Sequence, residues 1–152
     1  VRPMRCVVQR VKWAKVEVEG ALTGQIGPGF LALVGCQEGD GPQDMGYILD
    51  KLCTLRLFED EQGKMNLSIG QVGGAILLVS QFTLLGDGRH GRRPSFSHAA
   101  RPELAQPMLD QLAQGIRDRG IPVSTGKFQA HMEVSLLNDG PVTLLLDSRK
   151  GF

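Results

Sequence analysis

Short apolar runs separated by glycine- and proline-rich turns predict a chain made mainly of β-strands. The alternation of apolar and polar residues that marks a half-buried strand is clear in "AKVEVEG". "FLALVGC" is instead continuously apolar, which is typical of a strand buried on both faces, and "AILLVSQFTL" contains the most hydrophobic strand of the chain. The expected strands are residues 4–11, 14–20, 21–27, 30–36 and 75–84, two short strands within 55–69, and a strand, a turn and a last strand within 130–148.

Two stretches have the apolar spacing of an amphipathic helix. The first runs from about Gln43 to Leu55, and the second opens at Pro102 and closes at Gly120. Pro107 lies inside the second pattern and is expected to cost a hydrogen bond or to force a bend. Together these elements predict the α+β class, a single domain with a mostly antiparallel sheet and two main helices. The apolar stripes are Met45, Ile48, Leu49 and Leu52 in the first helix and Leu104, Met108, Leu112 and Ile116 in the second.

The composition narrows the size and class of the protein. A chain of 152 residues fits one domain with a real core, and 20 glycines with 8 prolines indicate many tight turns. The domain is expected to cover residues 4–152, with residues 1–3 a cloning remnant and Met4 the natural start. The net charge of +1 gives no global basic field for nucleic acid, so a polyanion would need a local patch. The apolar stretches are too short to span a membrane, and we expect a cytoplasmic protein without membrane contact.

Cysteine and histidine give no sign of a metal site. Cys6, Cys36 and Cys53 lie among apolar neighbours without C-x-x-C spacing, which favours buried, reduced thiols over reactive or metal-binding ones. The three histidines form no metal-binding motif. We therefore expect neither a metal nor a cofactor.

Two short segments remain as candidates for chemistry. "SQFT", Ser80 to Thr83, places hydroxyl and amide groups at the end of the most hydrophobic strand, a favoured position for binding groups. Taken alone, these polar residues mark only the end of a strand. Gly140-Pro141, in "NDGPVTLLLDS", precedes an apolar run, and proline is confined to strand starts, edges and bulges. Alone, this pair is a turn without a function.

Together with other ordered motifs, these segments resemble a known family. "SQFTL", "GRRPSFS", the F-x-A-H-M of Phe128 to Met132 and "NDGPVT" occur in this order, and "QRV" and "GKMNLS" extend the match. The sequence is similar to the D-aminoacyl-tRNA deacylase family from Met4 to about Leu146. The resemblance implies this family's fold, with a barrel-like sheet. It also implies hydrolysis of the ester between a D-amino acid and the 3′-terminal adenosine of tRNA, which releases the free D-amino acid.

The resemblance further implies a homodimer with its active site at the subunit interface. The SQFT segment of one subunit would face Gly140-Pro141 of the other, whose peptide bond is cis in this family. This Gly-Pro wall, formed by Gly140 and Pro141, would leave side-chain space only on the D side and exclude L-amino acids. Glycine has no side chain to exclude, so glycyl-tRNA is expected to be cleaved as well.

Two catalytic routes remain open within the resemblance. Thr83 could act as a nucleophile, although an unassisted threonine hydroxyl is a poor one. Alternatively, the backbone N–H groups around Phe82 and Thr83 form an oxyanion hole, and the 2′-hydroxyl of the substrate's ribose assists water. We favour this second route, in which Ser80 and Gln81 shape the pocket.

The resemblance assigns further binding residues. Phe128 and Met132 would contact the terminal adenine, the alternative being that both are core residues. Arg10, from "QRV", would brace the Gly-Pro segment. Acceptor-stem phosphates would be held by four basic residues, the alternative being a solvated loop. These residues are Arg89, Arg92, Arg93 and Lys127.

Two rival functions are considered. A non-catalytic nucleic-acid-binding module keeps the basic loop and Phe128 but needs no Gly-Pro segment. A serine esterase acting on small molecules is disfavoured, because the sequence has no G-x-S-x-G motif.

Overall fold

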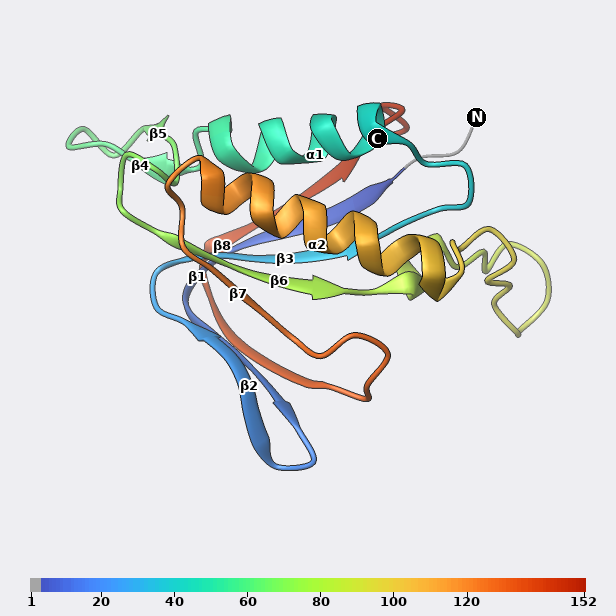
Figure 1. The fold of residues 1–152 in the computed structure, drawn as a ribbon. Coiled ribbons are helices and arrows are strands. Elements are labelled where there is room, and N and C mark those ends of the chain that lie inside the picture. Colours follow the sequence, from blue (N-terminus) through green and yellow to red (C-terminus); the bar gives the residue numbers. More distant parts are fainter. Residues whose placement is uncertain (1–3) are drawn as a thin grey trace.

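The computed structural model describes residues 4–152. One long central strand organises its sheet. β1 (Arg5–Val18) pairs in antiparallel fashion with three strands (Figure 1). Its first half pairs with β3 (Gly29–Gly35), its second half with β2 (Ala21–Ile26), and both halves with β8 (Glu133–Asp147) on the other side. The predicted break near residue 12 is therefore wrong, because pairing with β8 keeps β1 in one piece. The predicted cloning remnant, residues 1–3, lies outside the described residues.

Two parallel pairings continue the sheet beyond β3. β6 (Ala75–Ser80) lies parallel to β3 and β7 (Val123–Thr125) lies parallel to β6, so the order is β2-β1-β3-β6-β7 with β8 on β1. The sheet curls until its two ends approach each other, and the Ser124 hydroxyl of β7 donates to the Gln25 carbonyl of β2 at 3.1 Å. The predicted sheet, mostly antiparallel and barrel-like, is confirmed, and its parallel section is a feature that the sequence pattern did not reveal.

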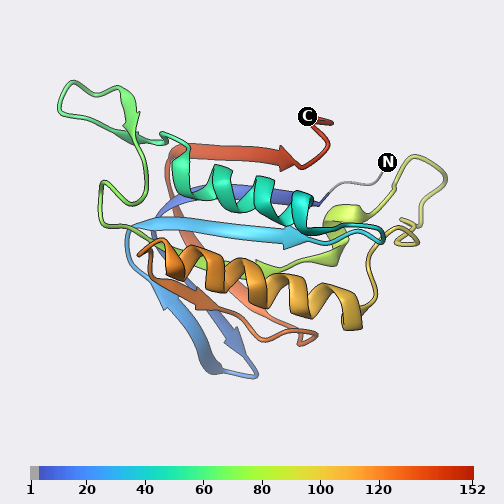
Figure 2. The same cartoon turned by 45° about the horizontal axis from the view of Figure 1, so that its top comes forward.

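Both predicted helices are present, and they cover the same face of the sheet (Figure 1, Figure 2). α1 (Pro42–Thr54) starts with proline in its first turn, and the Asp44 carboxylate accepts the Gly41 N–H at 2.9 Å, as in a capping box. α2 (Pro102–Asp118) continues through Pro107, which leaves one carbonyl of the preceding turn without its helical N–H partner. Among residues 4–152, no helix is long and apolar enough to cross a membrane.

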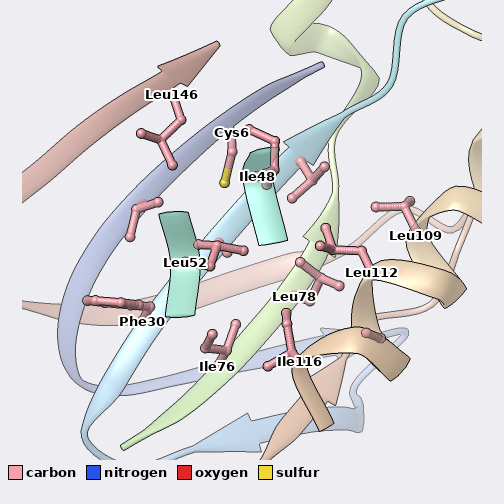
Figure 3. Close-up of a cluster of buried hydrophobic side chains, with 14 of the residues drawn as sticks. Cys6, Phe30, Ile48, Leu52, Ile76, Leu78, Leu109, Leu112, Ile116 and Leu146 are labelled. Atoms are coloured by element: carbon pink, nitrogen blue, oxygen red, sulfur yellow. The ribbon is translucent and has the colours of Figure 1, made fainter. Parts of the chain in front are cut away.

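The core has two parts, one on each face of the sheet. Phe30 and Ile76 point toward the helices and pack with Leu52 and Ile116 (Figure 3). Side chains alternate between faces along a strand, so Leu31 and Leu77 lie in the second cluster, inside the curled part of the sheet. This explains why β3 and β6 are continuously apolar. Full burial of one such side chain stabilises the fold by about 1.5–3 kcal/mol.

One expected hairpin is present, and one expected turn is absent. β4 (Phe58–Glu59) and β5 (Met65–Leu67) form the expected short hairpin, which projects from the body of the domain (Figure 2). The expected turn at residues 138–140 is instead part of the continuous strand β8. The chain does not reverse there because β8 pairs with β1 on both sides of these residues.

Candidate active site

The SQFT segment lies where β6 ends and the chain enters a short 3-10 helix. Ser80 is the last residue of β6 and η1 (Phe82–Leu85) follows, so the predicted strand to residue 84 ends early. Gln81 joins the two elements. Its N–H donates to the Val34 carbonyl at 2.8 Å, and its side-chain amide donates to the Thr83 hydroxyl at 3.0 Å. The segment is thus fixed to the sheet by its backbone, while Thr83 stays exposed.

The start of η1 presents two backbone N–H groups. Phe82 and Thr83 are the first residues of a helix, and the first N–H groups of a helix have no intrahelical acceptor. Gly35 of β3 allows η1 to pack closely, because a Cβ at this position would lie 2.9 Å from the Gln81 carbonyl oxygen. Donors held in this way can stabilise a negatively charged oxygen atom.

An apolar cavity of about 530 Å³ opens beside the SQFT segment. Residues 80–83 line one side of it and residues 128–132 line another. The rest of its wall consists of small apolar residues, which carry no sequence motif and which only the fold brings together. These wall residues are Cys36, Ala99, Ala100, Pro102 and Ala105.

Phe128 and Met132 stand between this cavity and a smaller one of about 310 Å³. Both are half-buried. Phe128 packs against the core under the helices, and Met132 packs against the core inside the curled sheet. They therefore line the cavities and contribute to the core at the same time. His131, between Ala130 and Met132, also lines the larger cavity and is exposed.

The four basic residues predicted to hold phosphates have different surroundings in the structure. Arg89 makes a bidentate contact with Asp87, whose two carboxylate oxygens lie 2.9 and 2.7 Å from its guanidinium. The hydrogen bonds from Arg89 hold the pKa of Asp87 well below its usual range, so Asp87 offsets this positive charge. Arg92 and Arg93 are exposed in the same loop, whereas Lys127 lines the smaller cavity.

Gly140-Pro141 lies in a bulge of β8. Val11 of β1 pairs with Asn138, but Gln9 pairs with Thr143, so two steps along β1 correspond to five along β8. The four residues Asp139 to Val142, which we call the bulge, lie opposite the single residue between those pairs. The Gly140-Pro141 bond is cis, as the resemblance implies, and both residues are exposed.

Arg10 is the residue opposite the bulge, and its side chain holds three segments together. It is 5% exposed, and its guanidinium donates to the Asp139 carbonyl at 2.9 Å and to the Leu57 carbonyl at 2.7 Å. The carboxylates of Asp139 and Glu59 each lie 3.7 Å from it. Arg10 thus contacts the bulge, as expected of a bracing residue, and it also anchors the hairpin of β4 and β5.

Within one chain, the bulge and the SQFT segment lie far apart. Arg10 pairs with Phe30 in β3, whereas Ser80 pairs with Val34, four residues further along β3. Four residues of strand span about 13 Å, and the three strand spacings from β8 to β6 add about 14 Å across the sheet. The two segments are therefore on the order of 15–20 Å apart and cannot contact one small substrate group from the same chain.

The thiol in the cavity wall is unsuited to nucleophilic chemistry. Burial, reinforced by the nearby Asp40 carboxylate, raises the pKa of Cys36 to about 12, so the thiol stays protonated. Cys6 and Cys36 are buried and free, as predicted, and Cys53 is free but only half-buried. Among residues 4–152, no group of three acidic, histidine or cysteine side chains could hold a metal ion.

Comparison with known proteins identifies the family. The profile of the family described as D-Tyr-tRNA(Tyr) deacylase matches residues 7–147. A D-aminoacyl-tRNA deacylase from Anaeromyxobacter dehalogenans is 56% identical over 98% of this chain and 100% of its own. One from Clostridioides difficile is 54% identical over the same shares. The chain belongs to the D-aminoacyl-tRNA deacylase family. The predicted family and the predicted class of enzyme, an ester hydrolase of this type, are therefore confirmed.

Solved structures agree on the fold of this deacylase. One described as c-Myc DNA Unwinding Element Binding Protein has a TM-score of 0.88 and 37% identity, and covers 93% of this chain and 97% of its own. Another, a probable eukaryotic D-amino acid tRNA deacylase, has a TM-score of 0.81 at 16% identity, with 95% and 99% covered. At that identity the likeness extends to the fold alone.

Proposed function

We propose that the protein hydrolyses the ester of D-aminoacyl-tRNA at a site completed by a second copy of the chain. One observation supports a site formed by two chains. The cavity with the SQFT segment and the exposed Gly140-Pro141 lie at distant places in one chain, yet the family motifs include both. In a symmetric dimer, each bulge reaches the cavity of the partner and two equivalent sites result.

In this arrangement the Gly-Pro wall selects the substrate by exclusion. Gly140 has no side chain, so the amino acid can approach the backbone of the bulge closely. An L side chain strikes the wall, whereas a D side chain points away from it. Glycyl-tRNA presents no side chain to exclude, so it is cleaved too.

The ester is attacked by water, and the SQFT segment stabilises the charge that develops. The N–H groups of Phe82 and Thr83 donate to the oxyanion of the tetrahedral intermediate. The ribose 2′-hydroxyl assists the attacking water. The Thr83 hydroxyl accepts a hydrogen bond from the Gln81 amide, and within residues 4–152 it has no hydrogen bond to a base that could activate it as a nucleophile. Cys36 stays protonated and contributes only to the cavity wall.

The nucleic acid is held around the two cavities. Phe128 and Met132 offer an aromatic face and a thioether to the terminal adenine, and Lys127 lies at the smaller cavity for a phosphate. Arg92 and Arg93 reach the acceptor stem from the exposed loop, with Arg89 contributing less because Asp87 neutralises it. The enzyme works in the cytoplasm, where aminoacyl-tRNA is found.

An apolar row on the sheet face opposite the helices supports association with a second copy. Leu145 of β8 pairs with Val7 of β1, which pairs with Leu33 of β3. Leu145 is 52% exposed, and the other two are partly buried. Covering this row by a partner would remove apolar surface from water.

A complementation experiment tests the shared site. Thr83→Trp places a bulky side chain at the mouth of the cavity, and Gly140→Ala alters the wall. Each variant alone should have little activity on D-tyrosyl-tRNA. After the two are unfolded together and refolded, half of the dimers are mixed, and each of these has one intact site. About a quarter of the parent activity should return. No recovery, although mixed dimers form, would refute a site built from two chains.

The substrate range separates this proposal from a non-catalytic nucleic-acid-binding module. That rival is supported by the similarity to c-Myc DNA Unwinding Element Binding Protein. We expect release of the amino acid from D-tyrosyl-tRNA and glycyl-tRNA, and not from L-tyrosyl-tRNA. Binding of all three without release would favour the module. Resistance of glycyl-tRNA alone would show that a positive side-chain contact selects the substrate.

A further inference from the structure

The bulge of β8 is held at its base by one side chain that the site described above does not include. The Asn138 side-chain oxygen accepts the Val142 N–H at 2.8 Å, and its side-chain nitrogen donates to the Val142 carbonyl at 3.1 Å. The amide therefore gives Val142 the donor and the acceptor that a neighbouring strand would give it. In this way it replaces the pairing with β1 that the bulge interrupts.

The same amide connects the bulge to the sheet. Its nitrogen lies 3.3 Å from the Thr143 hydroxyl, which also accepts from the Gln9 side chain at 3.4 Å. Gln9 and Thr143 form the first regular pair after the bulge. Asn138 thus sits at the point where β8 leaves the ladder and contacts the point where it returns.

Two anchors therefore fix the ends of the bulge. Arg10 holds the carbonyl of Asp139 at one end, and Asn138 holds Val142 at the other. Gly140 and Pro141 are exposed between these anchors, whereas Val142 is 7% exposed. A segment of four residues fixed at both ends has little freedom to change the direction of its exposed backbone.

We infer that Asn138 is a positioning residue of the deacylase: its side-chain amide sets where Gly140 and Pro141 stand relative to the substrate's amino acid. This inference rests on the proposed role of these two residues as a wall. Asn138 does not touch the substrate. It acts through the backbone of the bulge. Its substitution should therefore lower the rate of ester hydrolysis, which needs an accurately placed amino acid, and should leave the affinity for tRNA unchanged.

The test compares Asn138→Ala and Asn138→Asp with the parent protein. Asn138→Ala removes both contacts to Val142. Asn138→Asp keeps the acceptor for the Val142 N–H but replaces the donor with a carboxylate oxygen that repels the Val142 carbonyl oxygen. Asn66→Ala is the matched control, because Asn66 is an exposed asparagine of β5 whose side-chain oxygen accepts a hydrogen bond from Arg56.

We expect Asn138→Ala to lower kcat on D-tyrosyl-tRNA by about 10- to 100-fold, with the dissociation constant for uncharged tRNA unchanged. Asn138→Asp should lower kcat at least as much, because its carboxylate oxygen repels the Val142 carbonyl oxygen, and Asn66→Ala should match the parent. A merely structural role would lower the thermal midpoint and the amount of folded protein without this selective loss of kcat. If Asn138→Ala does not fold, the same measurements on Asn138→Asp decide.

A kcat within twofold of the parent in folded variants overturns the inference, and so does a parallel loss of tRNA affinity. A parent protein that leaves D-tyrosyl-tRNA intact refutes the proposed function itself. A parent that cleaves this substrate while both Asn138 variants match Asn66→Ala refutes only the positioning role.

Discussion

At the end of β6 the chain encloses a cavity of about 530 Å³, whereas at the bulge of β8 it projects two exposed residues, Gly140 and Pro141. The first region presents donors beside an apolar space, as a binding site does. The second is fixed at its base and exposed at its tip, as a segment that enters another molecule's site would be. One chain therefore carries the two segments at separate places, which is why we propose that a second copy of the chain completes the site.

The largest expected effect comes from the exposed half. Gly140 has φ +144°, and a Cβ there would lie 2.7 Å from a Val142 methyl. Gly140→Ala should therefore displace the wall and lower kcat/KM on D-tyrosyl-tRNA by about 100-fold. Gly20→Ala is the control, since Gly20 also has positive φ (79°) but no atom within 4 Å of the added Cβ. Equal activity of the two variants would show that the bulge makes no substrate contact.

The cavity half should respond in a different kinetic parameter. A Cβ on Gly126 would lie 2.6 Å from the Met132 sulfur, a flexible group that can move into the cavity. We expect Gly126→Ala to raise KM by about five- to tenfold with kcat nearly unchanged, because ground-state binding is lost. Gly46→Ala, in α1 with open space around the added Cβ, should leave both parameters alone. A fall in kcat only would contradict a binding role for this cavity.

Thr83 should matter less than either glycine. Thr83→Ala removes the hydroxyl that accepts from Gln81 but keeps the backbone N–H, so kcat should fall by only about fivefold. A substrate with a 2′-deoxy terminal adenosine should react very poorly with the parent. An inactive Thr83→Ala variant together with normal cleavage of the deoxy substrate would identify Thr83 as the nucleophile.

The smallest effect is expected behind the cavity wall, on stability. One Asp40 oxygen accepts the Gln37 N–H at 2.6 Å, while the other is buried without a hydrogen-bond partner among the described residues. Burial raises the pKa of Asp40 to about 6. Between about pH 4 and 6 the folded state therefore keeps a proton that the unfolded chain has lost, and the free energy of unfolding falls as the pH rises.

Asp40→Asn should remove this pH dependence and raise the thermal midpoint at pH 7 by about 2 °C. Melting curves of parent and variant from pH 4 to 8 would measure it, with activity at pH 7 unchanged. A variant that melts below the parent at pH 7 would show that the Asp40 charge is stabilising.

The sequence predicted the elements well, because their signals are local. The spacing of apolar residues, together with flanking glycine or proline, predicted both helices and nearly every strand. The parallel pairing of β3 with β6 depends on contacts between distant segments, which no local pattern encodes. The turn expected at Gly140 is a bulge for a related reason: the pairing of Thr143 with Gln9 across the sheet decides whether the chain reverses there.

The candidate site was predictable where a motif marked it and not elsewhere. Ser80 to Thr83 and Gly140-Pro141 stood out as polar or conformationally special residues beside apolar runs. Ala99, Ala100 and Ala105 did not, because an alanine in a cavity wall looks like any other alanine. The contact between Arg89 and Asp87 was likewise not predicted, because only the structure shows these two side chains bound to each other.

The pairing of β1 with β8 has a consequence for folding during synthesis. The Met4 N–H donates to the Ser148 hydroxyl at the end of this pairing, so residues 144 positions apart in the chain lie side by side. During synthesis β1 emerges early and must wait, with one edge unpaired, until β8 leaves the ribosome. Contacts of such long range slow folding, and an open strand edge invites association with other chains. The bulge to which we assign substrate selection lies in this last strand, so the ribosome makes nearly the whole chain before it makes this segment.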